Sequence, residues 1–564
     1  MLFSKFVEYL DELEKNSSRL VMTDVLAKLI NDLSVDEIEE GIYLSLGQLG
    51  PDYSKLDMGM ATKMVLRAVA EMTGQESVKL EEEYKKLGDL GDYVAKETKG
   101  VGGKMKVVDV YKILWKIGTE SGEGSQERKV NGLVDLLRSL SSLERKYVVR
   151  MVLGKVRIGF SAKTIFDALS QVESGSKDLR KQLDNVYQMY PDVGHIAKKI
   201  KEEGVIGLSK IKVKTGVPVV SALCQRLNEY GEIVKKMGEV GVERKYDGSR
   251  VQIHYKKKQA FLKTFTRNLE ESSNMFPELL EMGKWIEADE VILDAEACGY
   301  DKSTNKVLPF QVTITRKRKH GVQKASEDVP LRFFVFDILN LNGESLLDET
   351  YETRRESLKR IIKRNDVLVV DETIRTNIAS EIEKLHTKFL AEGYEGAVVK
   401  KWNGFYLPGR QGWNWVKIKE AEGTSGKLSD TLDLVILGYY LGRGKRAGFG
   451  MGAFLVGTKK GDKWVSLAKI GTGLTDNEFK GLSDKLSELQ LDEKMQNVDV
   501  EGSLVPDVWV VPKVVVEIAA DEITKSPNHS GGVALRFPRL VKFRDDKGPD
   551  QITSWKEILQ IGKI

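Results

Sequence analysis

The sequence of 564 residues is poor in cysteine and histidine, with two cysteines and five histidines. Cys224 and Cys298 lie far apart and no CxxC pair occurs, which excludes a disulfide framework and a four-cysteine zinc site. No apolar run reaches the roughly 18 residues of a membrane-spanning helix, and the N-terminal segment lacks the apolar core of a signal peptide. We therefore expect a protein with no zinc and no membrane association, in the cytoplasm or, in a eukaryote, the nucleus.

A strong net charge is also missing. The chain has 88 Lys and Arg residues against 84 Asp and Glu residues, a formal net charge of +4. Binding to a polyanion would therefore need local clusters of basic residues. With 41% hydrophobic and 30% charged residues, the composition is that of a soluble globular protein. At roughly 150 residues per domain, the length predicts two to four domains.

The apolar pattern changes twice along the chain. Up to about residue 208 apolar residues recur at helical spacing, as in Phe3, Phe6, Val7 and Leu10. From about residue 217 short β-type runs alternate with helical stretches, and from about residue 423 short strands and Gly-rich turns dominate. The sequence thus predicts an all-α domain (1–216), a mixed α/β domain (217–422) and a small β-barrel (423–564).

The sharpest chemical signal is the segment 243–250, GluArgLysTyrAspGlySerArg. It places Lys245 between extended segments and follows it with an Asp-Gly turn pair. A lysine becomes a nucleophile only when its ammonium loses a proton, which burial or nearby cations such as Arg244 and Arg250 promote. A single Lys-x-Asp-Gly match also occurs in ordinary surface turns, so this segment alone does not identify a function.

Carboxylates and lysines follow at strand positions. Glu296 ends one strand-like segment, Glu395 and Lys400 flank another, and Lys417 and Lys419 share one face of a third, because strand side chains alternate with period two. Carboxylates beside a phosphate are unfavourable unless a divalent cation lies between them. Glu296 and Glu395 are therefore predicted magnesium ligands, with lysines facing the remaining phosphate charge.

Six motifs occur in the order known from the covalent nucleotidyltransferases: Lys245-Tyr-Asp-Gly-Ser-Arg250, Phe-Thr-Arg267-Asn-Leu-Glu, Asp-Ala-Glu296, Phe336-Asp-Ile-Leu-Asn-Leu-Asn-Gly, Glu395-Gly-Ala-Val-Val-Lys400 and Trp415-Val-Lys417-Ile-Lys419. The chain resembles the ATP-dependent DNA ligases of the archaeal and eukaryotic replicative type. The likeness covers nearly the whole chain, including the terminal segment 534–547. It implies a helical DNA-binding domain, an adenylation (nucleotidyltransferase) domain and a C-terminal OB-fold.

The resemblance implies a reaction in three steps. Lys245 attacks the α-phosphorus of ATP, forms a lysyl-AMP and releases pyrophosphate. The AMP passes to the 5′-phosphate of nicked double-stranded DNA, and the 3′-hydroxyl then attacks that activated phosphate and displaces AMP. ATP and Mg²⁺, with Mn²⁺ as a substitute, are the expected cofactors, and DNA replication, repair and recombination are the expected settings.

The resemblance also implies roles for individual residues. In the nucleotide site these are adenine contacts for Glu243 and Phe336, ribose contacts for Arg250 and Glu296, a place near the phosphates or the DNA end for Arg267, and α-phosphate contacts for Lys417 and Lys419. In the terminal motif, Arg536, Arg544, Asp546 and Lys547 would approach the pyrophosphate when the last domain closes. Closure implies a hinge near residues 420–425.

A basic cluster in the helical part is the predicted DNA contact. It includes Arg145, Lys155 and Arg157, and phosphate binding of this kind is independent of base sequence. Such a run is more often a solvated helix face, but the Arg157-Ile-Gly match to the family favours the DNA-binding interpretation.

The sequence departs from the family pattern at residue 411. The usual basic residue six positions before the first lysine of the WxKxK strand is Gln411 here, and Arg410, one position earlier, is the candidate phosphate contact. We find no clear clamp-binding box, so a sliding clamp stays open as a partner. A capping guanylyltransferase and a non-catalytic DNA-binding scaffold are the alternatives, and the motifs leave the choice among ATP, ADP and GTP open.

Overall fold

The computed structural model forms two compact units, Met1–Lys419 and Glu420–Ile564. It describes the chain except for residues 17, 55, 57, 101, 228, 317–321, 420–430, 443–449, 527 and 563. The predicted hinge at residues 420–425 lies outside the described residues. Within those residues, no helix combines the length and the apolar character needed to cross a membrane.

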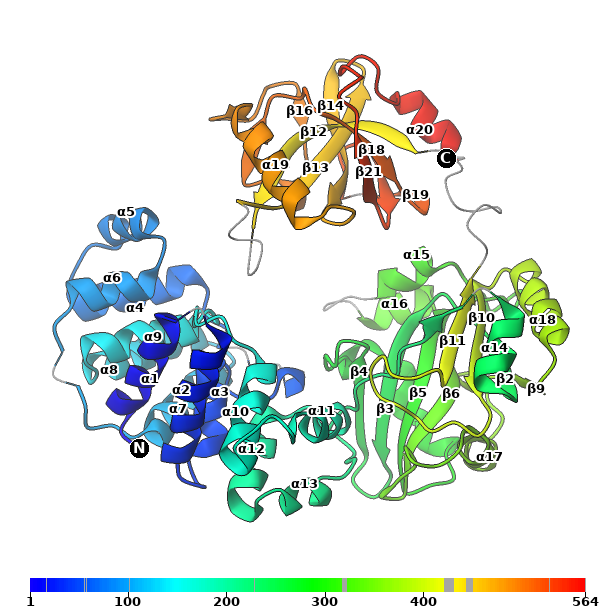
Figure 1. The fold of residues 1–564 in the computed structure, drawn as a ribbon, viewed down its shortest axis with the longest axis horizontal. Coiled ribbons are helices and arrows are strands. Elements are labelled where there is room, and N and C mark those ends of the chain that lie inside the picture. The colour runs from blue at the N-terminus through cyan, green and yellow to red at the C-terminus, as the bar shows by residue number, and fades with distance from the viewer. Residues whose placement is uncertain are drawn as a thin grey trace. The chain divides into compact units, whose positions relative to one another are not determined.

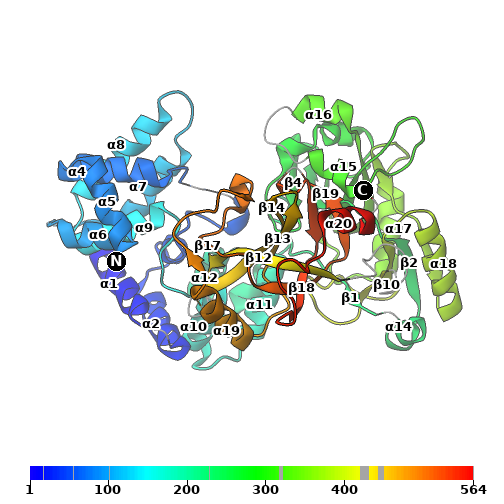
Figure 2. The same ribbon diagram turned by 90° about the horizontal axis from the view of Figure 1, so that it is seen from above.

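The first part of the larger unit is helical, as the apolar spacing predicts (Figures 1 and 2). In the first helix, Phe3, Phe6, Val7 and Leu10 are at most 1% exposed, which is the 3–4 spacing of a single buried face. The helices are α1 (Phe3–Glu14), α2 (Arg19–Asp32), α3 (Ile38–Ser45), α4 (Thr62–Thr73), α5 (Ser77–Leu87), α6 (Leu90–Glu97), α7 (Val107–Thr119), α8 (Ser125–Arg138), α9 (Ser142–Val152), α10 (Ala162–Ser174), α11 (Arg180–Met189), α12 (Val193–Glu203) and α13 (Ile206–Lys210).

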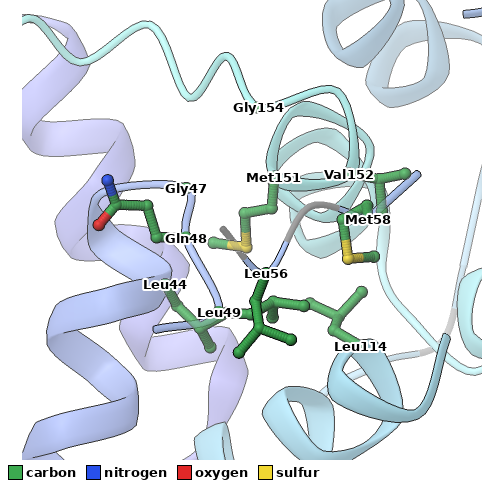
Figure 3. Close-up of a pocket in the computed structure, with 10 residues that line it drawn as sticks. All are labelled: Leu44, Gly47, Gln48, Leu49, Leu56, Met58, Leu114, Met151, Val152 and Gly154. Carbon is green, nitrogen blue, oxygen red and sulfur yellow. The ribbon is translucent and has the colours of Figure 1, made fainter. Parts of the chain in front are cut away.

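A small pocket remains in the helical core (Figure 3). Its volume is about 50 Å³, and its lining is largely apolar: Leu44, Gly47, Gln48, Leu49, Leu56, Met58, Leu114, Met151, Val152 and Gly154. Met58 and Met151 line it, and methionine's flexible side chain suits such irregular gaps. The pocket is a packing feature of the helical part and carries none of the predicted site residues.

Two sheets make up the rest of the larger unit. The first has the strand order β1-β11-β10-β2-β9, with β1 (Gln225–Arg226), β2 (Val240–Arg244), β9 (Thr373–Thr376), β10 (Gly396–Lys401) and β11 (Trp415–Lys419). The second has the order β4-β3-β5-β6-β7, and β8 also pairs with β6; its strands are β3 (Ser249–Lys256), β4 (Phe261–Thr266), β5 (Glu290–Gly299), β6 (Leu331–Leu341), β7 (Glu344–Ser345) and β8 (Leu368–Val370). The predicted mixed α/β character of this part is confirmed.

Helices cover one face of each sheet. On the first sheet, α14 (Tyr230–Met237) and α18 (Ala379–Ala391) bury Val242, Val399 and Val416 (Figure 1). On the second sheet, α17 (Tyr351–Ile361) packs its Leu358 into the core with Leu293. Short helices α15 (Phe310–Thr313) and α16 (Val322–Asp328) precede β6. The uncovered face of each sheet is thereby left for the other sheet and for polar side chains.

The two free faces approach one another. The Phe336 ring on β6 lies edge-on to the Trp415 ring on β11, with centroids 5.9 Å apart. The Arg250 guanidinium on β3 lies over both rings, 5.3 and 5.4 Å from their centroids. These contacts join the sheets, so motif residues far apart in the sequence meet between them.

The smaller unit is rich in strands, as the sequence predicts. One sheet runs β15-β17-β12-β13-β14-β16, with β18 paired to β12 and β21, and β19 and β20 form a hairpin. Helices α19 (Asp476–Ser487) and α20 (Trp555–Ile561) contribute Phe479, Leu482 and Ile558 to its core. The strands are β12 (Leu432–Leu441), β13 (Met451–Lys460), β14 (Lys463–Ile470), β15 (Gln490–Leu491), β16 (Val498–Asp499), β17 (Val508–Val510), β18 (Val515–Ala519), β19 (Glu522–Lys525), β20 (Val533–Arg536) and β21 (Arg539–Phe543).

Candidate active site

Strand pairing places the predicted nucleotide-binding residues of the first sheet in adjacent rows. Directly opposite residues on neighbouring strands point to the same face, and residues two apart on one strand share that face. Two rows on the uncovered face are therefore Gly241, Lys400 and Trp415, and next to them Thr373, Glu243, Val398 and Lys417. Lys245 lies two residues beyond Glu243.

Lys245 follows the last residue of β2 and is held by backbone hydrogen bonds. Its N–H donates to the Gly396 carbonyl, and its own carbonyl accepts from the Glu395 N–H, each at 3.0 Å. Its ammonium group forms an ion pair with the Glu395 carboxylate, and both side chains are largely buried, at 20% and 24% exposure. The sheet thus fixes the backbone on both sides of the lysine.

Glycine is needed three residues after Lys245 because the turn there lies directly against β5. A Cβ atom on Gly248 would lie 2.6 Å from the Ala297 carbonyl oxygen and 2.6 Å from the Cys298 sulfur. Any side chain would push the turn away from the strand that carries Glu296. The close approach accounts for the glycine of the Lys-x-Asp-Gly segment.

Arg250 is locked into a fixed position between the sheets. Its Nε donates to Asp294 Oδ1 at 2.9 Å, and its Nη2 donates to Oδ2 at 2.5 Å, which is a bidentate pair with a fully buried carboxylate. Nη1 also donates to the Ala222 carbonyl, and the Tyr406 hydroxyl donates to Asp294. The sequence analysis did not predict Asp294 or Tyr406 as site residues. Asp294 is two residues before Glu296, so the two side chains share one face of β5.

Glu296 lies opposite Arg250 on β5, in the interior of the site. Burial raises the pKa of Glu296 to about 7; the charges of Asp294 and Glu395 act in the same direction, whereas Lys245 and Arg250 lower the pKa. A carboxyl whose ionisation is opposed by burial and by other carboxylates gains from a nearby cation. Glu296 and Glu395, the two predicted metal ligands, are thus both within electrostatic reach of Lys245.

Cations gather around the same point. Arg250, Lys245, Lys400 and Lys417 all lower the pKa of the buried Cys224 thiol, although burial raises it overall. Arg250 and Lys400 also lie over the same two rings, Phe336 and Trp415, so positive charge lies between the sheets, where it suits a polyphosphate. The effect on the pKa of Cys224 reflects these positive charges, and we assign Cys224 no role of its own.

The Lys400 ammonium is enclosed by aromatic rings. It is 1% exposed and lies 4.7 Å from the Phe336 centroid, 4.9 Å from that of Tyr351 and 4.4 Å from that of Trp415. It donates to the Phe336 carbonyl and forms an ion pair of 2.8 Å with Glu243. Phe336 itself is only half-buried, in contrast to Phe333 and Val335 of the same strand. Its ring is the aromatic surface on β6 beside this cluster.

The other predicted residues of this part lie at the rim. Arg267 is exposed directly after β4 and lines a cleft of about 460 Å³ together with Ser249, Thr266 and Arg316. Arg410 is exposed before β11, and its neighbour Gln411 donates hydrogen bonds to Gln188 of α11 and to the Pro408 carbonyl. Gln411 therefore ties this loop to the helical part. The backbone of Lys419 ends β11, and its side chain lies outside the described part of the structure.

The predicted DNA contacts of the helical part separate into two groups. Lys155 and Arg157 are exposed after α9, and Arg157 has a left-handed backbone (φ 61°). Arg145 is 6% exposed, and its Nε donates to the Leu137 carbonyl at 2.7 Å. DNA binding stays a prediction for all three, and the burial of Arg145 gives it no support.

Arg157 is linked to a buried ion network centred on Arg150. The Arg150 guanidinium, 3% exposed, contacts Glu14 at 2.7 Å, Asp92 at 3.0 Å and Asp89 at 3.1 Å. Asp89 also accepts from Arg157 Nε at 2.8 Å. The network joins α1, α6 and α9. Through Asp89 it also holds the side chain of Arg157.

Replacement of Glu14 by glutamine should weaken this network in a pH-dependent way. Burial opposes ionisation, but hydrogen bonds from Arg150, Tyr147 and Lys146 lower the pKa of Glu14 from 4.5 to about 2. The stabilisation is therefore complete above pH 4.5 and is lost as the pH falls toward 2. We expect Glu14→Gln to cost about 1–3 kcal/mol at pH 7. Thermal unfolding of both proteins from pH 7 to 3 should show that the difference in their stability becomes smaller below pH 4.5. A difference that stays constant with pH would contradict the role assigned to the Glu14 carboxylate.

The terminal motif forms a charged cluster at the start of β12. Asp433 accepts from Arg544 at 3.0 Å and from Lys547 at 2.5 Å, and Arg544 Nε also donates to Asp546 at 2.8 Å. Arg536 lies apart on the β19–β20 hairpin, with Glu522 as a partner at 3.4 Å. Three of the four predicted residues are therefore neighbours. Asp433 was not among the predicted residues.

Comparisons with known proteins identify the family of the chain. Three family models match in order: "DNA ligase N terminus" at residues 2–170, "ATP dependent DNA ligase domain" at 221–419 and "ATP dependent DNA ligase C terminal region" at 447–547. The chain is 42% identical to "Probable DNA ligase" of Dictyoglomus turgidum, covering 100% of this chain and 97% of that protein. It is 34% identical to "DNA ligase" of Sulfolobus acidocaldarius, covering 100% and 98%.

A solved structure shares the fold across most of the chain. "Pmar-Lig_Pre." has a TM-score of 0.56 at 19% identity and covers 96% of this chain and 99% of that one. The facing sheets and the lysine directly after β2 define the central part as a nucleotidyltransferase-type domain. By its full-length relatives and its three family matches, the chain belongs to the ATP-dependent DNA ligases.

Proposed function

We propose that this protein seals nicks in duplex DNA, with Lys245 as the residue that carries AMP. The observation that supports this most strongly is the position of Lys245 directly after β2, paired with Glu395, while Arg250 and Lys400 both lie over the Phe336 and Trp415 rings between the two sheets. In the free protein Lys245 is paired with Glu395, so this pair must open before Lys245 Nζ attacks the α-phosphorus.

The nucleotide would lie across the two facing sheets. We assign the adenine to Glu243 and the Phe336 ring, the ribose to Arg250 and Glu296, and the α-phosphate to Lys417 and Lys419. Asp294 already orients the Arg250 guanidinium in the free protein, which lowers the entropic cost of ordering this side chain when the nucleotide binds. In-line displacement at phosphorus depends mostly on such positioning and on neutralisation of charge.

Glu296 and Glu395 fit Mg²⁺ chemistry. Mg²⁺ is usually held by one or two carboxylates, with water and substrate phosphates completing its shell. Among the described residues no group of three or more His, Cys, Asp or Glu side chains is arranged to hold a metal. Glu296 and Glu395 would therefore hold the ion together with water and substrate phosphates. Bound there, Mg²⁺ or Mn²⁺ would neutralise phosphate charge. The two carboxylates would otherwise repel the triphosphate.

The remaining parts are assigned to DNA and to pyrophosphate. We infer three domains, 1–216, 217–422 and 423–564, the last an OB-fold. Lys155 and Arg157 are exposed and suited to phosphate contacts. Arg267 and Arg410 would contact phosphates at the rim of the site, and Arg536, Arg544, Asp546 and Lys547 would approach the pyrophosphate in the first step. A nicked duplex is the expected partner.

Transfer of label tests the proposal. Incubation of the protein with α-³²P-labelled ATP and Mg²⁺ should give a covalent protein–AMP adduct, and a chase with unlabelled nicked duplex should remove the label while the nick is sealed. An intact duplex is the matched control and should leave the adduct in place. Failure to form the adduct, or sealing of the nick without ATP, would overturn the proposal. Parallel incubations with ADP and GTP determine the nucleotide used.

A further inference from the structure

The Glu243 carboxylate is held by three donors in a buried position. Glu243 is 2% exposed; its Oε1 accepts from the hydroxyls of Tyr351 and Thr373, the latter at 2.9 Å, and its Oε2 pairs with Lys400 at 2.8 Å. The Tyr351 and Thr373 oxygens lie 3.2 Å apart. The Lys400 ion pair requires a carboxylate here, because an unpaired buried ammonium would be strongly destabilising, but it does not require the two hydroxyl donors on Oε1.

Tyr351 reaches Glu243 across β2 because residue 241 is glycine. A Cβ atom on Gly241 would lie 2.6 Å from Thr373 Cγ2 and 3.0 Å from Tyr351 Cε1. The backbone of Gly241 is not in the left-handed region, so its conformation does not require glycine. Glycine is needed here because a side chain would collide with Tyr351 and Thr373. The strand thus leaves a gap through which both hydroxyls approach the same carboxylate oxygen.

The helix that carries Tyr351 is firmly anchored. Tyr351 begins α17, and its N–H donates to the Gly404 carbonyl at 2.9 Å. Three residues later, the fully buried Arg354 donates to both oxygens of Asp337, at 2.7 and 3.2 Å, and also to the Glu349 carbonyl. The Tyr351 hydroxyl is therefore presented from a rigid support.

We propose that Tyr351, assisted by Thr373, is a positioning residue that fixes Glu243 as a hydrogen-bond acceptor for the exocyclic amine of the nucleobase, and thereby favours ATP over GTP. The inference rests on the proposed adenine contact of Glu243. All three partners of the carboxylate are donors, which keeps it an acceptor. The 6-amino group of adenine is a donor, whereas the O6 of guanine is an acceptor that a fixed carboxylate repels.

Tyr351→Phe removes the hydroxyl and keeps the ring that lies over Lys400. We expect the KM for ATP in adduct formation to rise about tenfold with kcat changed less than about twofold, since one hydrogen bond to a charged group is lost from binding. The preference for ATP over GTP should fall by a similar factor. An unchanged KM and an unchanged preference would overturn the inference.

An analogue without the amine separates positioning from a general structural effect. Purine riboside triphosphate lacks the 6-amino group, so the tenfold penalty of Tyr351→Phe should nearly vanish with it. A penalty of equal size with ATP and with the analogue would overturn the inference, because it would show that the hydroxyl acts independently of the amine. The matched control is Tyr255→Phe, because Tyr255 lies in the core between the second sheet and the 3₁₀ helix Pro277–Lys284. It should change neither the KM for ATP nor the preference for ATP over GTP.

Gly241→Ala tests the same arrangement from the other side. The added methyl group should displace both hydroxyls and raise the KM for ATP, with little further effect in the Tyr351→Phe background. Full additivity of the two changes would contradict the shared mechanism. These measurements compare adduct formation between proteins that all form lysyl-AMP, whereas failure of the wild type to form the adduct would overturn the proposed function itself.

Discussion

Lys245→Ala should form no covalent adduct with labelled ATP and should lose nick sealing by at least about 10⁴-fold. The Nζ atom of Lys245 is the only protein atom that bonds to the α-phosphorus in the proposed first step. Substitution of a neighbouring cation would leave this nucleophile in place. The loss should be complete at any ATP concentration, because it concerns bond formation and not binding. Denaturing electrophoresis of the labelled protein measures it directly.

A pre-adenylylated nick distinguishes loss of the nucleophile from loss of the site. The third step joins the 3′-hydroxyl to a phosphate that already carries AMP, so it needs no free amine at residue 245. We expect Lys245→Ala to seal this substrate while failing on an ordinary nick with ATP. The variant should also retain the wild-type melting temperature within about 2 °C, because alanine keeps both backbone hydrogen bonds that hold residue 245. Sealing of the ordinary nick by the variant would refute the assignment.

Glu296→Gln is expected to lower the rate of adduct formation by about 100-fold and to weaken its dependence on Mg²⁺. The side chain keeps its size and its place on β5, but it loses the negative charge that would hold the metal and balance the surrounding lysines. Glu395→Gln should give a similar loss, and in addition it frees Lys245 from its ion pair. A titration of the rate against Mg²⁺ concentration separates metal affinity from catalysis.

The matched control for these two variants is Glu290→Gln. Glu290 begins β5, six residues before Glu296, where it pairs with Lys256 at 3.3 Å at the far end of the strand. This variant should behave as the wild type at every Mg²⁺ concentration. Rates and Mg²⁺ dependence equal to wild type in Glu296→Gln and Glu395→Gln would show that the metal assignment is wrong.

Most of the architecture was predictable because its signals are local. Helical spacing in the N-terminal part and β-type runs after residue 217 both correspond to elements in the structure. The motif residues were predictable because the chemistry of a polyphosphate needs cations and carboxylates, and the order of the motifs is specific. Lys245 and Glu296 lie within electrostatic reach of each other, and Lys417 shares the uncovered face of the first sheet with Glu243 through Val398.

The remaining features depend on contacts between distant residues. Tyr351 begins a helix with no motif around it, and its link to Glu243 arises only when the first residue of α17 reaches β2 in the folded chain. Asp294 was detectable in principle, since it shares a face with Glu296. The burial of Arg145 was not, because a basic residue on an amphipathic helix has the same local pattern whether it caps a carbonyl or faces DNA.

The near-neutral net charge of +4 has a structural counterpart in local pairing. Many basic residues are neutralised where they stand, as Arg150 is by Glu14, Asp89 and Asp92. In the central part Lys245, Arg250 and Lys400 are likewise paired, with Glu395, Asp294 and Glu243. A polyanion would respond to such local arrangements of charge, and not to the sum over the chain.

The central claim is that AMP is carried on the Nζ atom of Lys245, and peptide mapping tests it most directly. The protein is incubated with ATP and Mg²⁺, digested under conditions that preserve phosphoramide bonds, and the modified peptide is sequenced by mass spectrometry. We predict a single AMP group on the peptide that contains Lys245, at that residue. AMP on Lys400, Lys417 or any other residue, with Lys245 unmodified, would contradict the account.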